Sequence, residues 1–198
     1  MQFDVDMFKD KSGLEIGGTS PYFEKIYSVA SSIKQIGFPT VDVTALPPLG
    51  DFDFVLSCNV LEHVANPIKA VYQQMQVLKQ NGLLVIVVPK KEKCFDCNRE
   101  ITLFEHLIWD FYNTDETDLT HVEEVVSTFD FSKHPIDGGM EKLKEQCLVN
   151  YRNRFLHHHV FNSTLLQEIC IYCELLIRVN TQFDDNNYII IAQKGDIK

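Results

Sequence analysis

The sequence predicts an α/β fold with a mostly parallel sheet and an antiparallel strand at one side. One observation is a strand–helix–strand run over residues 52–88, whose last strand, Leu83–Val88, is apolar at every position. Such a run is typical of a strand buried on both faces of a parallel sheet. The other observation is a pair of strand patterns, 174–180 and 188–193, joined by the short polar link 184–187. A link this short makes them antiparallel neighbours.

The first part of the chain contains short elements with little room for helices between them. Residues 13–18 indicate a strand that ends in a glycine turn, and residues 52–58 indicate a buried strand. Residues 27–30 and 40–43 are weaker strand candidates. Because the connections before residue 52 are short, we expect the helices in this front half to be trimmed.

The middle of the chain predicts an amphipathic helix between two strands. Asn66-Pro67 favours a helix start, since Asn is a good N-cap and Pro suits the first turn. Apolar residues from Ile68 to Leu78 recur at spacings of three and four, which gives one apolar face. We expect Asn81-Gly82 to end the helix. A helix between two strands is the usual crossover of a parallel pair.

Composition favours an ordinary globular domain. The 198 residues are 45% hydrophobic and 23% charged, which suits about one domain. Eighteen basic and 28 acidic residues give a net charge of −10, so nucleic acid and anionic membranes are poor partners. With neither a signal peptide pattern nor an apolar run of about 20 residues, we expect a cytoplasmic location.

The six cysteines are expected to be reduced in that location. Two pairs, Cys94/Cys97 and Cys170/Cys173, have C-x-x-C spacing, and together they could hold a zinc ion. The pairs are separated by far more than the about 15–20 residues of a zinc ribbon. The second pair also lies in an apolar helical run, which favours buried core positions. We therefore predict no zinc site of cysteines.

An ordered set of motifs occupies residues 13–89. It comprises E-I-G-G-T-S at 15–20, D-V-T-A-L-P at 42–47, F-D-F-V-L-S-C-N-V-L-E-H at 52–63, N-P at 66–67 and V-L-K-Q-N-G at 77–82. The set resembles the class I, Rossmann-like S-adenosylmethionine-dependent methyltransferases. That resemblance implies a three-layer sandwich, mostly parallel with an antiparallel C-terminal strand, here with a trimmed front half and a long helical insertion after the fifth strand.

The resemblance also implies a cofactor, S-adenosylmethionine, and a product, S-adenosylhomocysteine. Glu15 would orient the glycine turn or bind the amino acid end, and Gly17 and Gly18 would let the backbone pass under the cofactor. Asp42 lies where the family binds the adenine amino group. Leu61, Glu62 and His63 would form the rim that faces the acceptor. The candidate cofactor-binding residues are Glu15, Gly17, Gly18, Thr19, Ser20, Asp42, Ser57, Cys58, Asn59, Leu61 and Glu62.

One departure from the family concerns the ribose. The family usually ends its second strand with an acid that binds the ribose hydroxyls, whereas residues 27–37 contain neither Asp nor Glu. Ser31, Ser32 or Lys34 are the candidates to replace it.

Residues 90–160, called the lid below, are far longer than a usual connection and suit an acceptor-binding insertion. His106 and Asp110 are four residues apart, so on a helix they could pair as a general base. Trp109 and nearby tyrosines could stack on sugar C–H faces. The candidate catalytic residues are His106, Asp110, His121, His158 and His63. A divalent metal held by Asp110, His121 and a carboxylate such as Glu123 is a weaker alternative, and we predict no metal.

Three stretches, E-H-L-x-x-D-F at 105–111, D-L-T-H at 118–121 and H-H-H-V-F at 157–161, resemble a subgroup of small methyltransferases of polysaccharide biosynthesis. This implies O-methylation of a sugar hydroxyl of a glycan by in-line displacement. The alternatives are a methyltransferase for a non-sugar small molecule and a degenerate Rossmann-like binding module. We expect residues 1–198 to form a single methyltransferase domain, or one domain of a larger protein, and the sequence does not predict the oligomeric state.

Overall fold

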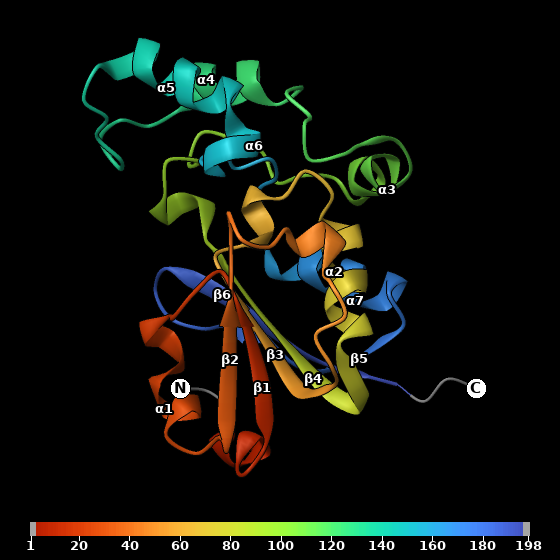
Figure 1. Ribbon diagram of the computed structural model, residues 1–198. Helices are drawn as coiled ribbons and strands as arrows, with labels where there is room; N and C mark the ends of the chain where they lie inside the picture. The colour runs from red at the N-terminus through yellow and green to blue at the C-terminus, as the bar shows by residue number, and fades with distance from the viewer. Residues whose placement is uncertain (1–2, 196–198) are drawn as a thin grey trace.

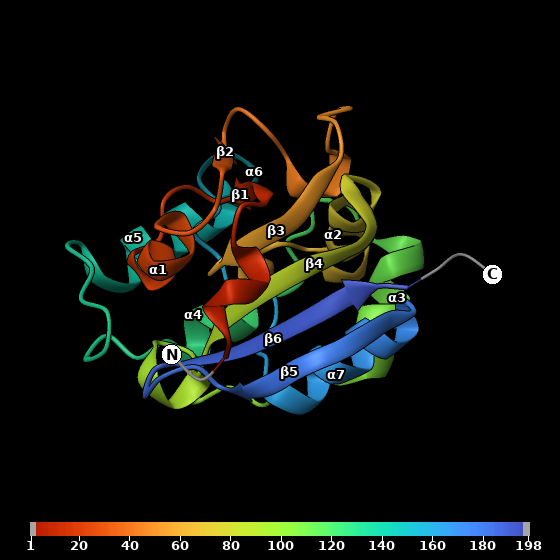
Figure 2. The ribbon, with the colours of Figure 1, turned by 90° about the horizontal axis from the view of Figure 1, so that it is seen from below.

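A computed structural model describes residues 3–195, which contain a six-stranded sheet in the order β2-β1-β3-β4-β6-β5 (Figures 1 and 2). Strands β2, β1, β3 and β4 are parallel, whereas β6 is antiparallel to both β4 and β5. The predicted α/β fold, with its mostly parallel sheet and antiparallel C-terminal strands, is confirmed. The strands are β1 (Ser12–Ile16), β2 (Ser32–Ile36), β3 (Phe52–Cys58), β4 (Leu78–Pro89), β5 (Leu175–Gln182) and β6 (Asn187–Lys194).

Strand β4 is buried on both faces, as its unbroken apolar run predicts. Its even-numbered residues from 84 to 88 join one core cluster, and its odd-numbered residues from 83 to 87 join another, because side chains alternate across a strand. The first cluster packs against α2 (Pro67–Gln76), α3 (Phe104–Asn113) and α7 (Ser163–Tyr172). The second packs against the short 3-10 helix η1 (Val5–Phe8) and α1 (Glu24–Tyr27). The front half is therefore trimmed, as expected.

The lid forms a helical layer beyond one end of the sheet (Figure 1). Besides α3, it contains α4 (Val122–Thr128), α5 (Gly139–Leu148) and α6 (Asn150–Asn153). Several of its apolar side chains make a separate small cluster around Phe95 and Leu143, which gives the lid a core of its own.

Two predicted strands in the front half are wrong. Tyr27 ends α1, and the amides of Ser28 and Ala30 bond back to helix carbonyls, so the chain turns there and β2 starts only at Ser32. Asp42 is the N-cap of the 3-10 helix η3 (Val43–Ala45). Its side chain accepts a hydrogen bond from the Thr44 amide at 2.8 Å, which favours a helical turn over a strand.

The predicted end of helix α2 is also wrong. The helix ends at Gln76, and Asn81-Gly82 lies inside β4. Asn81 has a positive φ of 61°, at the place where the register between β3 and β4 shifts. A Cβ on Gly82 would lie 2.9 Å from a backbone oxygen, so the glycine permits close approach within an irregular strand.

The positions of Cys170 and Cys173 agree with the prediction that they lie in the core. All six cysteines are free, and Cys170 and Cys173 are buried in the core around α7. Within residues 3–195, no helix combines the length and the apolar character that crossing a membrane would require.

Gly13 offers a direct test of the packing between β1 and β3. A Cβ at this position would lie 2.1 Å from the ring of Phe54, which is fully buried. We expect Gly13→Ala to lower the free energy of unfolding by about 1–3 kcal/mol through overpacking. Chemical denaturation measures this change, and Gly195→Ala is the control because its Cβ would meet only ordinary contacts at 3.8 Å. Equal stabilities of the two variants would contradict the described packing.

Candidate active site

The turn after β1 is built on Glu15, whose side chain is fully buried. Its carboxylate accepts hydrogen bonds from the Ser20 amide at 3.1 Å, the Tyr27 hydroxyl at 2.7 Å and Gln35 Nε2 at 3.1 Å. Burial of the Tyr27 hydroxyl and its hydrogen bond to Glu15 raise the pKa of Tyr27 well above its ordinary value. The phenol therefore keeps its proton and remains a hydrogen-bond donor. These contacts favour the loop-orienting role for Glu15.

A cavity of about 170 Å³ opens at the carboxyl ends of β1 and β3, where ligands bind in such sheets. Gly17 lines it with a φ of +98°, and a Cβ there would lie 2.5 Å from Val60. Asn59 lines it too, with a φ of +51° that Asn tolerates better than most residues. Of the residues proposed from sequence, the cavity is lined by Gly17, Asp42, Asn59 and His63.

Asp42 connects this cavity to the lid. Its Oδ1 accepts from the Thr44 amide and hydroxyl, while its Oδ2 accepts from Arg154 Nη2 at 2.8 Å. Arg154 also pairs with Glu116, and its guanidinium lies 5.2 Å from the ring centroid of Phe38. No role was predicted for Arg154 or Phe38, yet both line the cavity. Any ligand that binds Asp42 must therefore share it with a guanidinium.

His63 and Glu62 lie on the 3-10 helix η4 (Leu61–His63), which follows β3. Burial lowers the pKa of His63 to about 3, so this cavity-lining imidazole is neutral near pH 7. Burial raises the pKa of Glu62 to about 7. Nitrogen and oxygen atoms of the two residues lie within 4.8 Å of each other. This pair can accept a proton at one member and hold it at the other.

The remaining cofactor candidates differ in position. Leu61 is fully buried in the core, so the predicted role at the acceptor rim is wrong for it. Ser57 is also buried, and burial raises the pKa of the half-buried Cys58 thiol to about 11. Gly18 has open space around it at a φ of +99°, and Thr19 accepts a hydrogen bond from a glutamine side chain. The exposed part of the turn is Gly17-Gly18-Thr19, whereas Ser20 is buried.

Two of the suggested substitutes for the ribose acid, Ser31 and Ser32, do not fit the topology. Ser32 pairs with Ser12 at the amino end of β2, and Ser31 precedes it, so both lie at the opposite end of the strand from the cavity. Near the carboxyl end, Gln35 donates to both Glu15 and Thr19. A polar amide, and not an acid, therefore stands at that end of β2.

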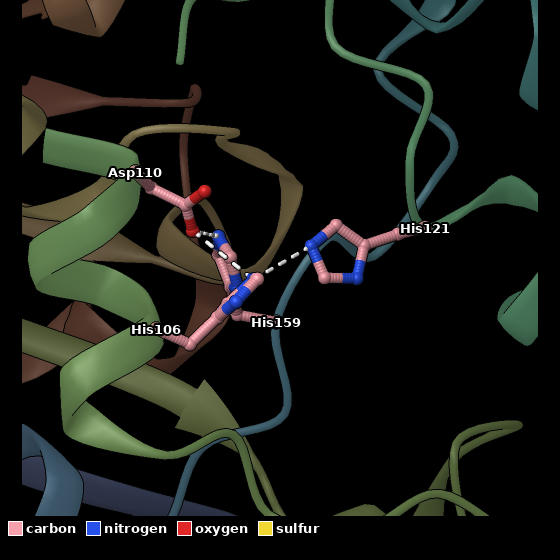
Figure 3. A group of neighbouring side chains, drawn as sticks. All are labelled: His106, Asp110, His121 and His159. Carbon is pink, nitrogen blue, oxygen red and sulfur yellow. Dashed lines mark hydrogen bonds and ion pairs between the residues drawn. The ribbon is translucent and has the colours of Figure 1, made fainter. Parts of the chain in front are cut away.

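The lid brings several catalytic candidates together (Figure 3). His106 and Asp110 pair on α3 as predicted, with Nε2 and Oδ2 3.3 Å apart. His106 Nε2 also lies 3.1 Å from His121 Nε2. His159, to which the sequence assigned no role, has its Nε2 3.4 Å from Asp110 Oδ2. Burial raises the pKa of Asp110 and lowers that of His159.

His158 lies apart from this group. Its side chain is fully buried, with Nε2 2.9 Å from the side-chain nitrogen Nδ2 of Asn150 and Nδ1 3.9 Å from Asp118 Oδ2. Burial lowers its pKa to about 3. It does not line the cavity, and its contacts suit a structural position.

The exposed lid aromatics are Trp109, Tyr112 and Tyr151.

Residues 14–86, which contain the cavity-lining turns of β1 and β3, match a family described as "Methyltransferase domain". The match covers this part of the chain and leaves the lid outside it. The matched part also contains every cofactor candidate proposed from the sequence. No curated protein matches the sequence of the chain.

Solved structures of methyltransferases share the fold of the methyltransferase domain and lid together. The N-methyltransferase NodS from Bradyrhizobium japonicum WM9 is 12% identical with a TM-score of 0.54, and the match covers 97% of this chain and 90% of NodS. A 1,6-didemethyltoxoflavin-N1-methyltransferase from Burkholderia thailandensis, with its namesake compound and S-adenosylhomocysteine bound, is 9% identical with a TM-score of 0.53. That match covers 95% of this chain and 72% of the other.

A third structure, an O-methyltransferase family 2 protein from Planctomyces limnophilus DSM 3776 in complex with apigenin, is 12% identical with a TM-score of 0.50. The match covers 93% of this chain and 51% of that one. These similarities confirm the Rossmann-like methyltransferase fold. They do not select an acceptor, since the related structures are named for different chemistries.

The cavity residues fit S-adenosylmethionine, the cofactor of this fold. Asp42 offers an acceptor for an amino group, and Gly17 lets a ligand approach the backbone. The cavity is smaller than the roughly 300–1,000 Å³ of most ligand pockets, and the open turn at Gly18 leaves space beside it. Residues 14–86 thus offer the hydrogen-bond acceptor and the backbone approach that this cofactor needs.

The raised pKa of Glu62 predicts a pH dependence of stability. Between pH 4.5 and about 7 the folded state keeps a proton that the unfolded state loses, so stability falls as pH rises through this window. The residues facing Glu62 are His157 and Asp96. We expect Glu62→Gln to gain stability relative to wild type across this window, by on the order of 3 kcal/mol at most.

Denaturation at pH 4.5 and pH 8 measures this difference. The control is Glu141→Gln, which changes an exposed carboxylate on α5 and should keep the wild-type slope. A Glu62→Gln profile parallel to wild type over the whole range would refute the raised pKa.

Proposed function

We propose that this methyltransferase domain transfers a methyl group from S-adenosylmethionine to a hydroxyl of a carbohydrate. The observation that carries the proposal is that the lid borders the cavity. Arg154, from the lid, lines it together with Gly17, Asp42 and His63. An acceptor held by the lid would therefore lie next to a methyl donor bound at the turn.

The residues suit a proton-coupled methyl transfer. The cofactor supplies a methyl group on a positively charged sulfur, open to in-line displacement. A sugar hydroxyl must lose its proton as its oxygen attacks, and His63, a neutral imidazole, lines the cavity where it can accept a hydrogen bond from that hydroxyl. Glu62, with a pKa of about 7, has an oxygen within 4.8 Å of a His63 nitrogen, and approach of the two groups would let His63 pass the proton to Glu62 while remaining neutral itself. Alignment of the two substrates in a site shielded from water would supply most of the acceleration.

Support for a sugar acceptor comes from the lid. Trp109, Tyr112 and Tyr151 are 55%, 70% and 44% exposed, although the Tyr112 hydroxyl contacts that of Tyr172 and Arg152 lies over the Tyr151 ring. Exposed aromatic rings provide flat apolar surfaces for sugar C–H faces.

A second candidate acceptor is a flat, non-sugar small molecule. Apolar side chains, among them Phe38, Val41, Val43, Val60 and Val64, form much of the cavity wall. The related structures above hold a didemethyltoxoflavin and apigenin, which are compounds of that kind. A binding module without activity is a third candidate, because β2 carries no acid at its carboxyl end.

Cofactor binding is tested by calorimetry with S-adenosylmethionine and S-adenosylhomocysteine. We expect wild type to bind both and Asp42→Asn to bind at least about tenfold more weakly, since a charged acceptor contributes more than a neutral one. The control is Asp51→Asn, an exposed acid in the neighbouring loop. Absence of heat with wild type at millimolar cofactor would favour the binding module.

Acceptor choice is tested by incubating the protein with methyl-labelled cofactor and panels of oligosaccharides, phenols and lipids. We expect label on the oligosaccharides, and a fall of about 10²–10⁴-fold in kcat for His63→Gln with little change in the KM for cofactor. His134→Gln, an exposed lid histidine, is the matched control. Transfer to phenols alone would reject the sugar proposal and support the flat acceptor.

A further inference from the structure

Four metal-ligating side chains converge inside the lid (Figure 3). His106 and Asp110 come from α3, His121 is the N-cap residue of α4, and His159 belongs to the segment that leads to α7. One ligand atom from each lies within 4.8 Å of those of the other three. Residues far apart in sequence thus present three imidazole nitrogens and one carboxylate oxygen to a single point.

The separations match those around a tetrahedral ion. Bonds of 2.0–2.1 Å to nitrogen and 2.0–2.2 Å to oxygen place neighbouring ligands about 3.3 Å apart in a tetrahedral zinc site. The distances here are 3.1 Å from His106 Nε2 to His121 Nε2, 3.3 Å from His106 Nε2 to Asp110 Oδ2, and 3.4 Å from His159 Nε2 to the same oxygen.

Asp110 Oδ2 itself indicates a missing positive partner. The Asp110 side chain is only 3% exposed, and within residues 3–195 no hydrogen bond of good geometry reaches this oxygen. Its other oxygen already accepts from the Thr114 hydroxyl at 3.0 Å. A buried carboxylate oxygen without a donor is costly, and a bound cation would compensate it.

A surrounding layer orients His121. Its Nδ1 lies 3.3 Å from Glu124 Oε2, which leaves Nε2 free to act as a ligand. Glu124 is held in turn by Arg99, with Nε 3.0 Å from Oε1. A carboxylate behind a ligating imidazole is the usual outer layer of a protein metal site.

We propose that His106, Asp110, His121 and His159 bind one divalent transition metal ion of the zinc class. Imidazole and carboxylate ligands at these separations suit such an ion better than magnesium, which prefers oxygen ligands. The site uses Asp110 and His121 from the weaker metal alternative drawn from the sequence, while Glu124, and not Glu123, supports it from outside. Binding would replace the contact of His159 Nε2 with the Ala65 carbonyl at 3.2 Å.

The bound ion would tie three segments of the lid to one another. It would cross-link α3, the start of α4 and the chain before α7, beside Val64 of the cavity wall. This role does not depend on which acceptor is methylated.

A neighbouring group, Cys94, Asp96 and His157, is a poorer candidate. Both carboxylate oxygens of Asp96 are occupied, one by Arg99 at 2.8 Å and the other by His157 Nδ1. Burial also raises the pKa of the Cys94 thiol to about 12, so the thiolate that a metal needs is disfavoured.

The test titrates chelator-treated full-length protein with Zn²⁺ and with Co²⁺. We expect one ion per chain by elemental analysis, the intense visible absorption of tetrahedral Co²⁺, and a higher melting temperature with Zn²⁺. His106→Gln and Asp110→Asn should weaken Zn²⁺ binding by at least about 100-fold, and Glu124→Gln by about 10–100-fold. His134→Gln, outside the group, should bind as wild type does.

The partly exposed His106 keeps the test valid if Asp110→Asn fails to fold, and circular dichroism of each variant checks this. Failure of wild type to bind either ion at stoichiometric amounts would overturn the proposal, as would equal binding by His106→Gln and wild type. A Co²⁺ spectrum typical of octahedral coordination would reject the four-ligand geometry. None of these results depends on methyl transfer, so the proposed function is tested separately.

Discussion

The lid depends on one buried cation, the guanidinium of Arg99. Only 2% of its side chain is exposed, and it bonds to Asp96, to Glu124 and to the backbone carbonyls of His157 and His158. A buried charge is tolerated only when its donors are satisfied, and here they join the start of the lid to α4 and to the chain before α7. The histidines and the cavity wall supplied by the lid depend on this arrangement.

The elements that could be predicted from sequence are those whose local signals agree with the tertiary structure. Strand β3 and the start of α2 follow from a buried apolar run and from an Asn-Pro cap. The strand predicted at residues 27–30 is wrong because α1 ends there through local backbone hydrogen bonds. This turn packs against the core, and such packing is not visible in the local sequence pattern. The helix end predicted at Asn81-Gly82 is wrong for a related reason. A residue with a positive φ, such as Asn81, occurs at an irregularity in a strand as well as at the end of a helix.

The residues of the candidate site likewise divide into those that local sequence signals predict and those that they do not. Gly17 and Asn59 could be found because the turns after parallel strands meet at one edge of the sheet, whereas Asp42 was found through the family resemblance. Arg154 could not, because its partners Asp42 and Glu116 are distant in sequence, and no local pattern specifies such pairing. The i, i+4 spacing of His106 and Asp110 revealed one half of the histidine group, whereas the approach of His159 required the folded lid.

The ion pair between Arg154 and Asp42 couples the two halves of the molecule. A ligand that donates hydrogen bonds to Asp42 competes with Arg154, and so weakens one of the contacts between the residue after α6 and the loop before η3. By reciprocity, any change in the lid that withdraws Arg154 alters the affinity for that ligand by the same factor. Ligand binding at Asp42 and the position of Arg154 are thus a single linked equilibrium, so a substitution at either end of this ion pair is felt at the other.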